Sequence, residues 1–153
     1  MLPLTATFSD DAYARALDSW TFLDLTGKTP LFTNLFGDVF LQSADGCWFL
    51  DTVEGSLGML WDRPAALAAE LGTPAGENRY LAGPLAQAAA DRGLILGPGQ
   101  VYTFLPPPIF TGRVSVGAIE VYDFVLAVNI TGQLHRQIRD LPPGADIGGV
   151  VLG

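Results

Sequence analysis

The stretch NLFGDVFLQSADGCWFLDTVEGSLGML, residues 34–60, decides the fold. Two apolar runs in it, DVFLQ and CWFLDTV, are joined by Asp45-Gly46, where glycine can take the positive φ angle that a tight hairpin requires. A second turn at Glu54-Gly55 sends the chain back through SLGML as a third strand. Strands alternating with short turns in this way predict an antiparallel meander.

Helical patterns lie on both sides of the meander in the sequence. Ser9 precedes DDAYARALDSW as a predicted N-cap residue, and two acidic residues occupy the first turn of this helix. After the meander, Asp62 is predicted to cap the helix RPAALAAEL, which ends near Gly72. The segment AGENRYLAGPLAQAAADRG continues with alanine-rich periodicity to Gly93, and Pro84 should kink or divide it.

The C-terminal third combines strand and turn patterns. A short strand at residues 101–104 is stopped by three consecutive prolines, which cannot donate hydrogen bonds to a sheet. The run AIEVYDFVLAVNI supplies the best candidate for a central strand, at Ile119–Ile130, because near-continuous apolar character predicts burial on both faces. TGQLHRQIRDL is predicted to form a short helix or turn, and the tail PPGADIGGVVLG has weak strand character at Val150 and Val151.

These elements predict one domain over residues 1–153, of the α+β class. We expect a mixed or largely antiparallel sheet with the Gly37–Leu60 meander on one side, the Ile119–Ile130 strand near the middle, and helices packed on one face. A chain of this length can remove roughly two thirds of its unfolded surface from water. A self-sufficient hydrophobic core is therefore expected.

Charge and composition narrow the classes of function. The formal net charge is −8, whereas sequence-independent nucleic-acid binding needs basic residues to displace counterions, so no nucleic-acid partner is predicted. An acidic surface attracts a basic partner. The alternative explanation is that such a surface only keeps the protein soluble. The start MLPLTATFSDD lacks the features of a signal peptide, and no apolar run approaches the roughly 20 residues of a membrane span. We therefore predict a cytoplasmic protein with no membrane partner.

Acidic residues are concentrated in and around the meander. The segment between Lys28 and Arg63 contains no Lys or Arg but holds five carboxylates: Asp38, Asp45, Asp51, Glu54 and Asp62. Acid/base catalysis would need two of them to converge in different environments. Carboxylates at turn positions are more often present for turn chemistry and solvation. The segment DTVEGSLG also lacks the alternating oxygen ligands of a calcium loop, so no metal is predicted here.

The single cysteine and the single histidine are the conventional nucleophile and base of this chain. Cys47 lies on a predicted strand among acidic residues, which favours a buried structural thiol over a reactive one. His135 is expected to hydrogen-bond near a helix end. One Cys and one His supply no zinc site, and LGPGQ lacks the Lys-Ser/Thr of a phosphate loop, so no cofactor is predicted. The segment FLPPPIF, with Phe110, is predicted to expose an apolar rim of the kind that marks partner surfaces.

Three segments together resemble a known family. FGDVFLQSADGCWFLDTVEGSL, RGLILGPGQVYTFLPPPIFTG and IEVYDFVLAVNITGQLHRQI resemble the domain at the C-terminus of type VI secretion immunity proteins, including those that neutralise a DNase effector. The resemblance extends from about Trp20 to Ile147 and rests on an ordered series of Gly, Pro and aromatic positions. It implies a cytoplasmic, non-enzymatic protein that binds a toxin.

The sequence thus supports hypotheses from different classes. The first is a non-enzymatic immunity-type module that binds a basic toxin or effector, with these candidate partner-binding residues: Asp38, Asp45, Asp51, Glu54, Phe110 and His135. The second is a small hydrolase or ligand-binding domain that uses the Asp38/Asp51 region or His135. A deep pocket lined by Asp51 and His135 would favour the second hypothesis. A structural or regulatory partner of another kind stays open, as does the oligomeric state.

Overall fold

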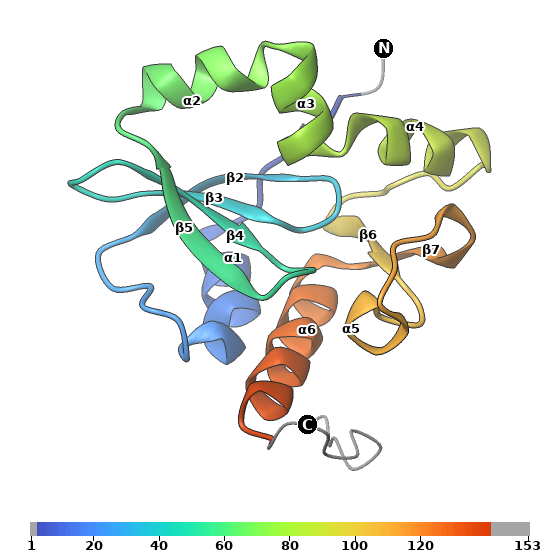
Figure 1. Cartoon of the computed structure of the whole chain (residues 1–153). Coiled ribbons are helices and arrows are strands. Elements are labelled where there is room, and N and C mark those ends of the chain that lie inside the picture. Colours follow the sequence, from blue (N-terminus) through green and yellow to red (C-terminus); the bar gives the residue numbers. More distant parts are fainter. Residues whose placement is uncertain (1–2, 142–153) are drawn as a thin grey trace.

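The computed structural model describes residues 3–141 of the chain as an α+β fold (Figure 1). Its larger sheet is antiparallel, and its strands lie in chain order. These strands are β1 (Thr5–Ala6), β2 (Thr29–Asn34), β3 (Val39–Gln42), β4 (Cys47–Asp51) and β5 (Ser56–Trp61). A separate antiparallel pair consists of β6 (Gln100–Phe104) and β7 (Ile119–Asp123). The predicted fold class and the meander are confirmed.

Helices occupy the longer connections between these strands and follow the last strand. They are α1 (Asp10–Leu17), α2 (Pro64–Leu71), α3 (Pro74–Leu81), α4 (Gly83–Asp91), α5 (Pro108–Thr111) and α6 (Phe124–Arg139), with short 3₁₀ turns at Asp18–Trp20 and Val116–Ala118. The predicted division at Pro84 is confirmed, because α3 and α4 meet at Ala82, whose φ angle is 49°. Asp62 does not cap α2; the N-cap is Arg63, and it makes no side-chain capping bond.

The two turns of the meander need glycine for different reasons. Gly55 has a φ angle of 72°, as a tight turn requires. Gly46 does not have a positive φ angle, contrary to our expectation. A Cβ atom there would lie 3.1 Å from the Met59 sulfur and closer still to the Trp61 carbonyl oxygen. Close approach of two backbones, rather than a left-handed conformation, therefore excludes larger residues at Gly46.

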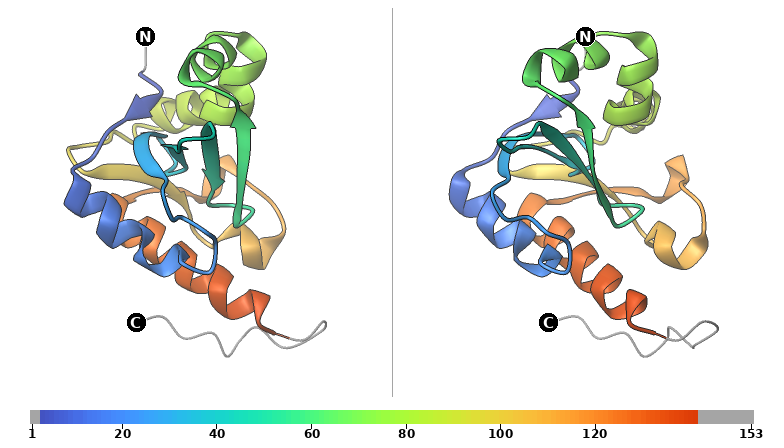
Figure 2. Two further views of the ribbon diagram at one scale, coloured as in Figure 1. Left: turned by 90° about the vertical axis from the view of Figure 1, so that its left-hand side faces the viewer. Right: turned by 60° about the vertical axis from the view of Figure 1, so that its left-hand side comes forward.

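Helices cover both faces of the larger sheet, whereas we expected them on one face (Figure 2). On one face, the buried side chains of Val39 and Leu41 pack with α1 and α6. On the other, Phe40 packs with Leu67 of α2 and Tyr80 of α3. The consecutive residues Val39, Phe40 and Leu41 of β3 are thus all buried and apolar, so both faces of this strand must be covered.

The predicted central strand at Ile119–Ile130 is wrong for most of its length. The strand β7 ends at Asp123 and, in the described part of the chain, pairs only with β6, outside the larger sheet. From Phe124 the chain continues as α6, and the Asp123 carboxylate accepts a hydrogen bond from the amide of Leu126 at 2.9 Å. The apolar run is therefore the start of a 16-residue helix with an aspartate N-cap, and Phe124, Ala127 and Val128 form its buried side.

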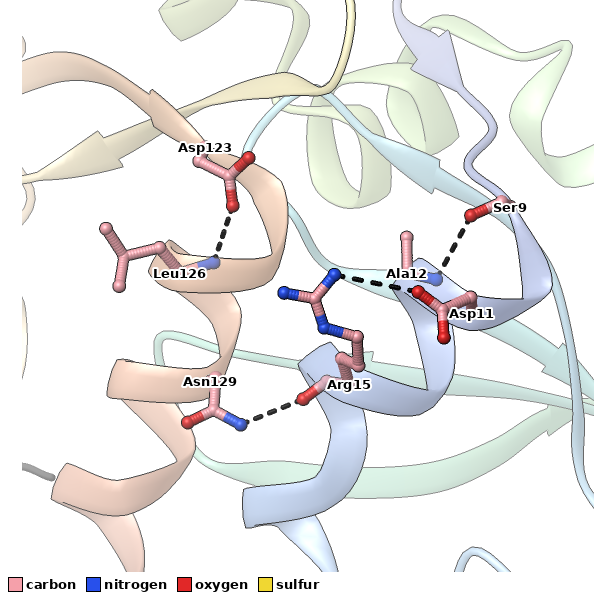
Figure 3. A network of polar contacts seen from close by, with 7 residues as sticks. All are labelled: Ser9, Asp11, Ala12, Arg15, Asp123, Leu126 and Asn129. Atoms are coloured by element: carbon pink, nitrogen blue, oxygen red, sulfur yellow. Dashed lines mark hydrogen bonds and ion pairs between the residues drawn. The ribbon is translucent and has the colours of Figure 1, made fainter.

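Helices α1 and α6 lie side by side and are joined by polar contacts (Figure 3). The hydroxyl of Ser9 caps α1 as predicted and accepts from the amide of Ala12 at 3.1 Å. Asn129 of α6 donates to the carbonyl oxygen of Arg15 at 2.9 Å. In addition, the indole of buried Trp20 donates to the carbonyl oxygen of Val128 at 2.9 Å. These long-range bonds fix α6 against the N-terminal helix.

The predicted strand at residues 101–104 is β6, and Gly93 follows α4 with a φ angle of 82°. The predicted strand character at Val150 and Val151 lies outside the described residues. Over residues 3–141, no helix combines the length and apolar character needed to cross a membrane.

Gly132 sits where α6 crosses the turn after α1, and we expect Gly132→Ala to destabilise the fold. A Cβ atom there would overlap the Ser19 hydroxyl and lie 2.6 Å from the Trp20 indole nitrogen. Overpacking should cost about 1–3 kcal/mol, against the roughly 1 kcal/mol that alanine gains over glycine in a helix. Chemical denaturation should therefore give a lower unfolding free energy. Gly72→Ala is the control, because its Cβ atom would make only 3.5 Å contacts; equal effects of both substitutions would contradict this packing.

Candidate functional site

The Asp38 carboxylate is a buried hydrogen-bond acceptor between two turns. Its Oδ1 atom accepts from the amide and the hydroxyl of Thr52, at 2.8 and 2.6 Å. Its Oδ2 atom accepts from the side-chain amide of Asn34 at 2.8 Å. Only 8% of Asp38 is exposed. The carboxylate therefore connects the turn between β2 and β3 with the turn between β4 and β5, and lies beneath the surface.

Burial raises the pKa of the Asp38 carboxyl to about 6. Loss of solvation is the largest cause, and repulsion by the neighbouring Asp51 carboxylate adds to it. The hydrogen bonds from Thr52 and Asn34 favour the charged form and act in the opposite direction. The pKa of the Asp38 carboxyl therefore depends on Asp51, which is also one of the candidate partner-binding residues.

His135 joins α6 to the same turn. Its Nε2 atom lies 2.8 Å from the carbonyl oxygen of Thr52. Because a carbonyl oxygen only accepts, Nε2 carries the hydrogen. The ring also packs against Gly55, where a Cβ atom would lie 2.5 Å from Nδ1, and its centroid is 5.5 Å from that of Trp20. His135 is 9% exposed and bonds from within the helix to a meander turn, rather than at a helix end as expected.

The remaining carboxylates of the meander do not converge. Asp51 is half-buried, and its Oδ1 atom accepts from the amides of Val53 and Glu54, both at 3.0 Å. It therefore holds its own turn, while the side chain of Glu54 is exposed. Asp45 is exposed in the turn between β3 and β4, at the opposite end of β4. The carboxylates that lie close together in the sequence are thus divided between the two ends of β4.

A cavity of about 320 Å³ lies beside His135. Its wall is formed by the β4–β5 turn (Thr52, Val53), by the segment from Thr103 to Phe110, and by α6 between Ala127 and His135. Phe110 and His135 therefore belong to one site, and Phe110 is 41% exposed at it. Asp51 is not part of the wall. Sequence reasoning singled out these two wall residues but did not predict the cavity, which α6 helps to form.

Cys47 and His135 lie on different sides of the larger sheet. Cys47 is fully buried in the cluster beneath α2 and α3, and burial raises the pKa of its thiol, with a further contribution from Asp62. His135 is in contact with Trp20, which belongs to the core on the other face. The structure therefore does not form the Cys–His pair. Within residues 3–141, no three His, Cys, Asp or Glu side chains gather closely enough to hold a metal ion.

Compared with models of known protein families the sequence matches none, and compared with curated proteins it has no significant match.

The arrangement around Asp38 predicts a specific titration. The carboxyl carbon of Asp38, followed by NMR, should titrate with a midpoint near pH 6. Asp51→Asn removes a neighbouring negative charge, so this midpoint should fall. Asp45→Asn, at the far end of β4, should leave it unchanged. A wild-type midpoint at the ordinary aspartate value of about 4 would refute this electrostatic picture, as would a midpoint indifferent to Asp51→Asn.

The sign of the effect on stability follows from the same pKa. The folded protein holds the Asp38 proton more tightly than the unfolded chain, since the folded pKa is the higher one. Asp38 therefore contributes stability to the folded protein at low pH. This contribution to the free energy of unfolding is lost as pH rises from about 4 to about 6.

Proposed function

We propose that the chain is a non-enzymatic, cytoplasmic protein-binding module of the immunity type, which neutralises a cognate toxin by binding it. The observation that carries this proposal is the outer edge of β5. Within residues 3–141, this strand ends the sheet and pairs only with β4. Its residues Ser56–Trp61 include no charge and no proline, and Met59 and Leu60 are 46% and 47% exposed. Uncharged edge strands of this kind are open to pairing with another chain.

A local irregularity explains why two consecutive side chains of β5 are exposed. The register shifts between Cys47 and Trp48 of β4, which pair with Trp61 and Met59. Leu60 is therefore the extra residue of a β-bulge and has no partner across the strands. Met59 and Leu60 together form the apolar centre of a surface at this end of the strand.

Carboxylates border this apolar centre. The close approach of Gly46 to Met59 and to the backbone of Asp62 places the β3–β4 turn, with Asp45, beside the exposed pair. We name Asp45, Met59, Leu60 and Asp62 the β5 edge patch. An apolar centre with a charged rim is the ordinary anatomy of a protein interface.

The charges of the patch favour a basic partner. Within the described residues Asp45 makes no ion pair, and the pair between Asp62 and Arg63 is long, at 4.0 Å, and exposed. Lys28 lies 4.2 Å from the ring of Trp48, the cross-strand neighbour of Met59, and reduces the local negative charge. The net charge of −8 nevertheless steers a basic protein toward this chain. The family resemblance supplies the class of partner, a toxin or effector.

The buried polar groups support binding rather than catalysis. Asp38 and His135 each hydrogen-bond to Thr52 within the fold. A general base must instead be available to a substrate. The alternative of a small hydrolase finds no carboxylate among the described residues of the cavity wall. The alternative of a ligand-binding domain is favoured by the cavity itself, which His135 borders.

Charge reversal at the two ends of β4 should locate the binding surface. The partner is first captured with the wild-type chain from cells that express secretion effectors, and is then purified. We expect Asp45→Lys to slow association by roughly threefold at low salt and to flatten its salt dependence, because rim charges act on encounter. The dissociation rate should change little. Stopped-flow mixing at two ionic strengths measures both rates.

Glu54→Lys is the matched control for this experiment. It makes the same charge change at an exposed turn, but at the opposite end of β4 from the β5 edge patch. We expect a clearly smaller effect on association. An association rate that changes neither with salt nor with Asp45→Lys would show that the acidic surface faces solvent and does not contribute to binding. A larger effect of Glu54→Lys would place the contact at the other end of the strand.

A further inference from the structure

The cavity beside His135 is separate from the β5 edge patch. It adjoins the β4–β5 turn, whereas the patch adjoins the β3–β4 turn at the other end of β4. Its volume of about 320 Å³ is roughly twice the ~150 Å³ of an apolar cavity that binds benzene. A cavity of this size accommodates a small molecule or a single large side chain, but no helix or strand of a partner.

The wall of the cavity selects against charge. Among the described residues that line it there is no Asp, Glu, Lys or Arg. A charged ligand would lose its hydration there and gain no opposite charge. Aromatic rings contribute much of the wall, from Phe36, Phe104, Phe110 and Tyr122. Such rings pack favourably with the edge or the offset face of another ring.

The polar groups of the wall differ in what they can offer. The hydroxyl of Thr52 donates to Asp38, and that of Thr131 donates to the carbonyl oxygen of Ala127 at 2.8 Å. The hydroxyls of Thr103 and Tyr122 make no hydrogen bond within residues 3–141. They lie on the neighbouring strands β6 and β7. One polar group of a ligand can therefore be satisfied on this side of the cavity.

From these features we propose that the cavity binds an uncharged aromatic molecule of about two fused rings that carries one hydroxyl or carbonyl group. The rings lie among the aromatic side chains, and the polar group bonds with Thr103 or Tyr122. This inference concerns a second site and does not depend on the protein partner proposed above.

Binding of 2-naphthol to the full chain tests the proposal, with NMR of the backbone amides as the readout. We expect saturable one-to-one binding, with the largest shifts at Val53, Thr103 and Leu134. The charged analogue 2-naphthoate should bind at least about tenfold more weakly. Removing both hydroxyls, in the double variant Thr103→Val/Tyr122→Phe, should weaken 2-naphthol binding by a few fold, because the hydroxyl of the ligand then loses its hydrogen bond.

A variant that fills the cavity gives the sharpest control. Thr131→Phe places a ring in the cavity from α6 and should weaken 2-naphthol binding by about tenfold or more. Leu126→Phe adds a ring at an exposed position of the same helix, outside the cavity wall. It should change the affinity for 2-naphthol by less than about twofold. Should Thr131→Phe lower the thermal midpoint strongly, Val53→Phe fills the cavity from the turn instead.

Three results would overturn the proposal. The first is no saturable binding of 2-naphthol by the wild-type chain. The second is binding that the folded cavity-filling variants leave unchanged. The third is a set of shifts confined to the β5 edge patch, which would show contact with the exposed apolar pair and not with the cavity.

Discussion

The interaction on which the rest of the structure depends is the set of hydrogen bonds around the buried carboxylate of Asp38. Burying this group is costly, as its raised pKa indicates. Three donors from Asn34 and Thr52 offset that cost, and bonds to a charged acceptor are stronger than neutral ones. The carbonyl oxygen of the same Thr52 then accepts from His135. One carboxylate thereby connects two turns of the sheet with a helix more than 80 residues further along the chain.

This connection makes the two ends of β4 different. At the end near Thr52, the chain is held by Asp38, Asp51 and His135, and it forms part of the wall of an apolar cavity. At the other end, the β3–β4 turn is exposed and lies beside the bulged edge of β5. The anchored end suits the recognition of a small molecule, and the exposed end suits a protein surface. We therefore assign the two proposed sites to opposite ends of one strand.

Local patterns predicted the elements whose signals are themselves local. The Ser9 cap, the break near Pro84 and the turn at Gly55 each follow from one or two residues, and all three are present. The run at Ile119–Ile130 was misread because a short continuous apolar run such as FVLAV fits a buried strand as well as a buried helix segment. The aspartate before Phe124 and the continuing periodicity to Arg139 were the signals that could have decided for a helix.

The candidate site could be predicted only in part. His135 and Phe110 were singled out and do share a cavity, but its wall comes from segments distant in sequence, and no local pattern reports their meeting. The charge run near the meander was visible, yet the sequence did not distinguish buried Asp38 from exposed Asp45. Burial and register depend on the tertiary fold, so the division of these carboxylates between two ends of β4 required the structure.

The most direct test of this account observes the ring hydrogen of the only histidine. In nitrogen-15 NMR of the folded wild-type chain, His135 should be the Nε2–H tautomer, and its ring hydrogen should exchange slowly with water. In Asp38→Ala, the Thr52 turn loses its anchor and the ring hydrogen should exchange rapidly while the helical circular dichroism is retained; Asp45→Ala should preserve slow exchange. A slowly exchanging Nε2 hydrogen in folded Asp38→Ala would contradict the claim that this carboxylate holds the turn against α6.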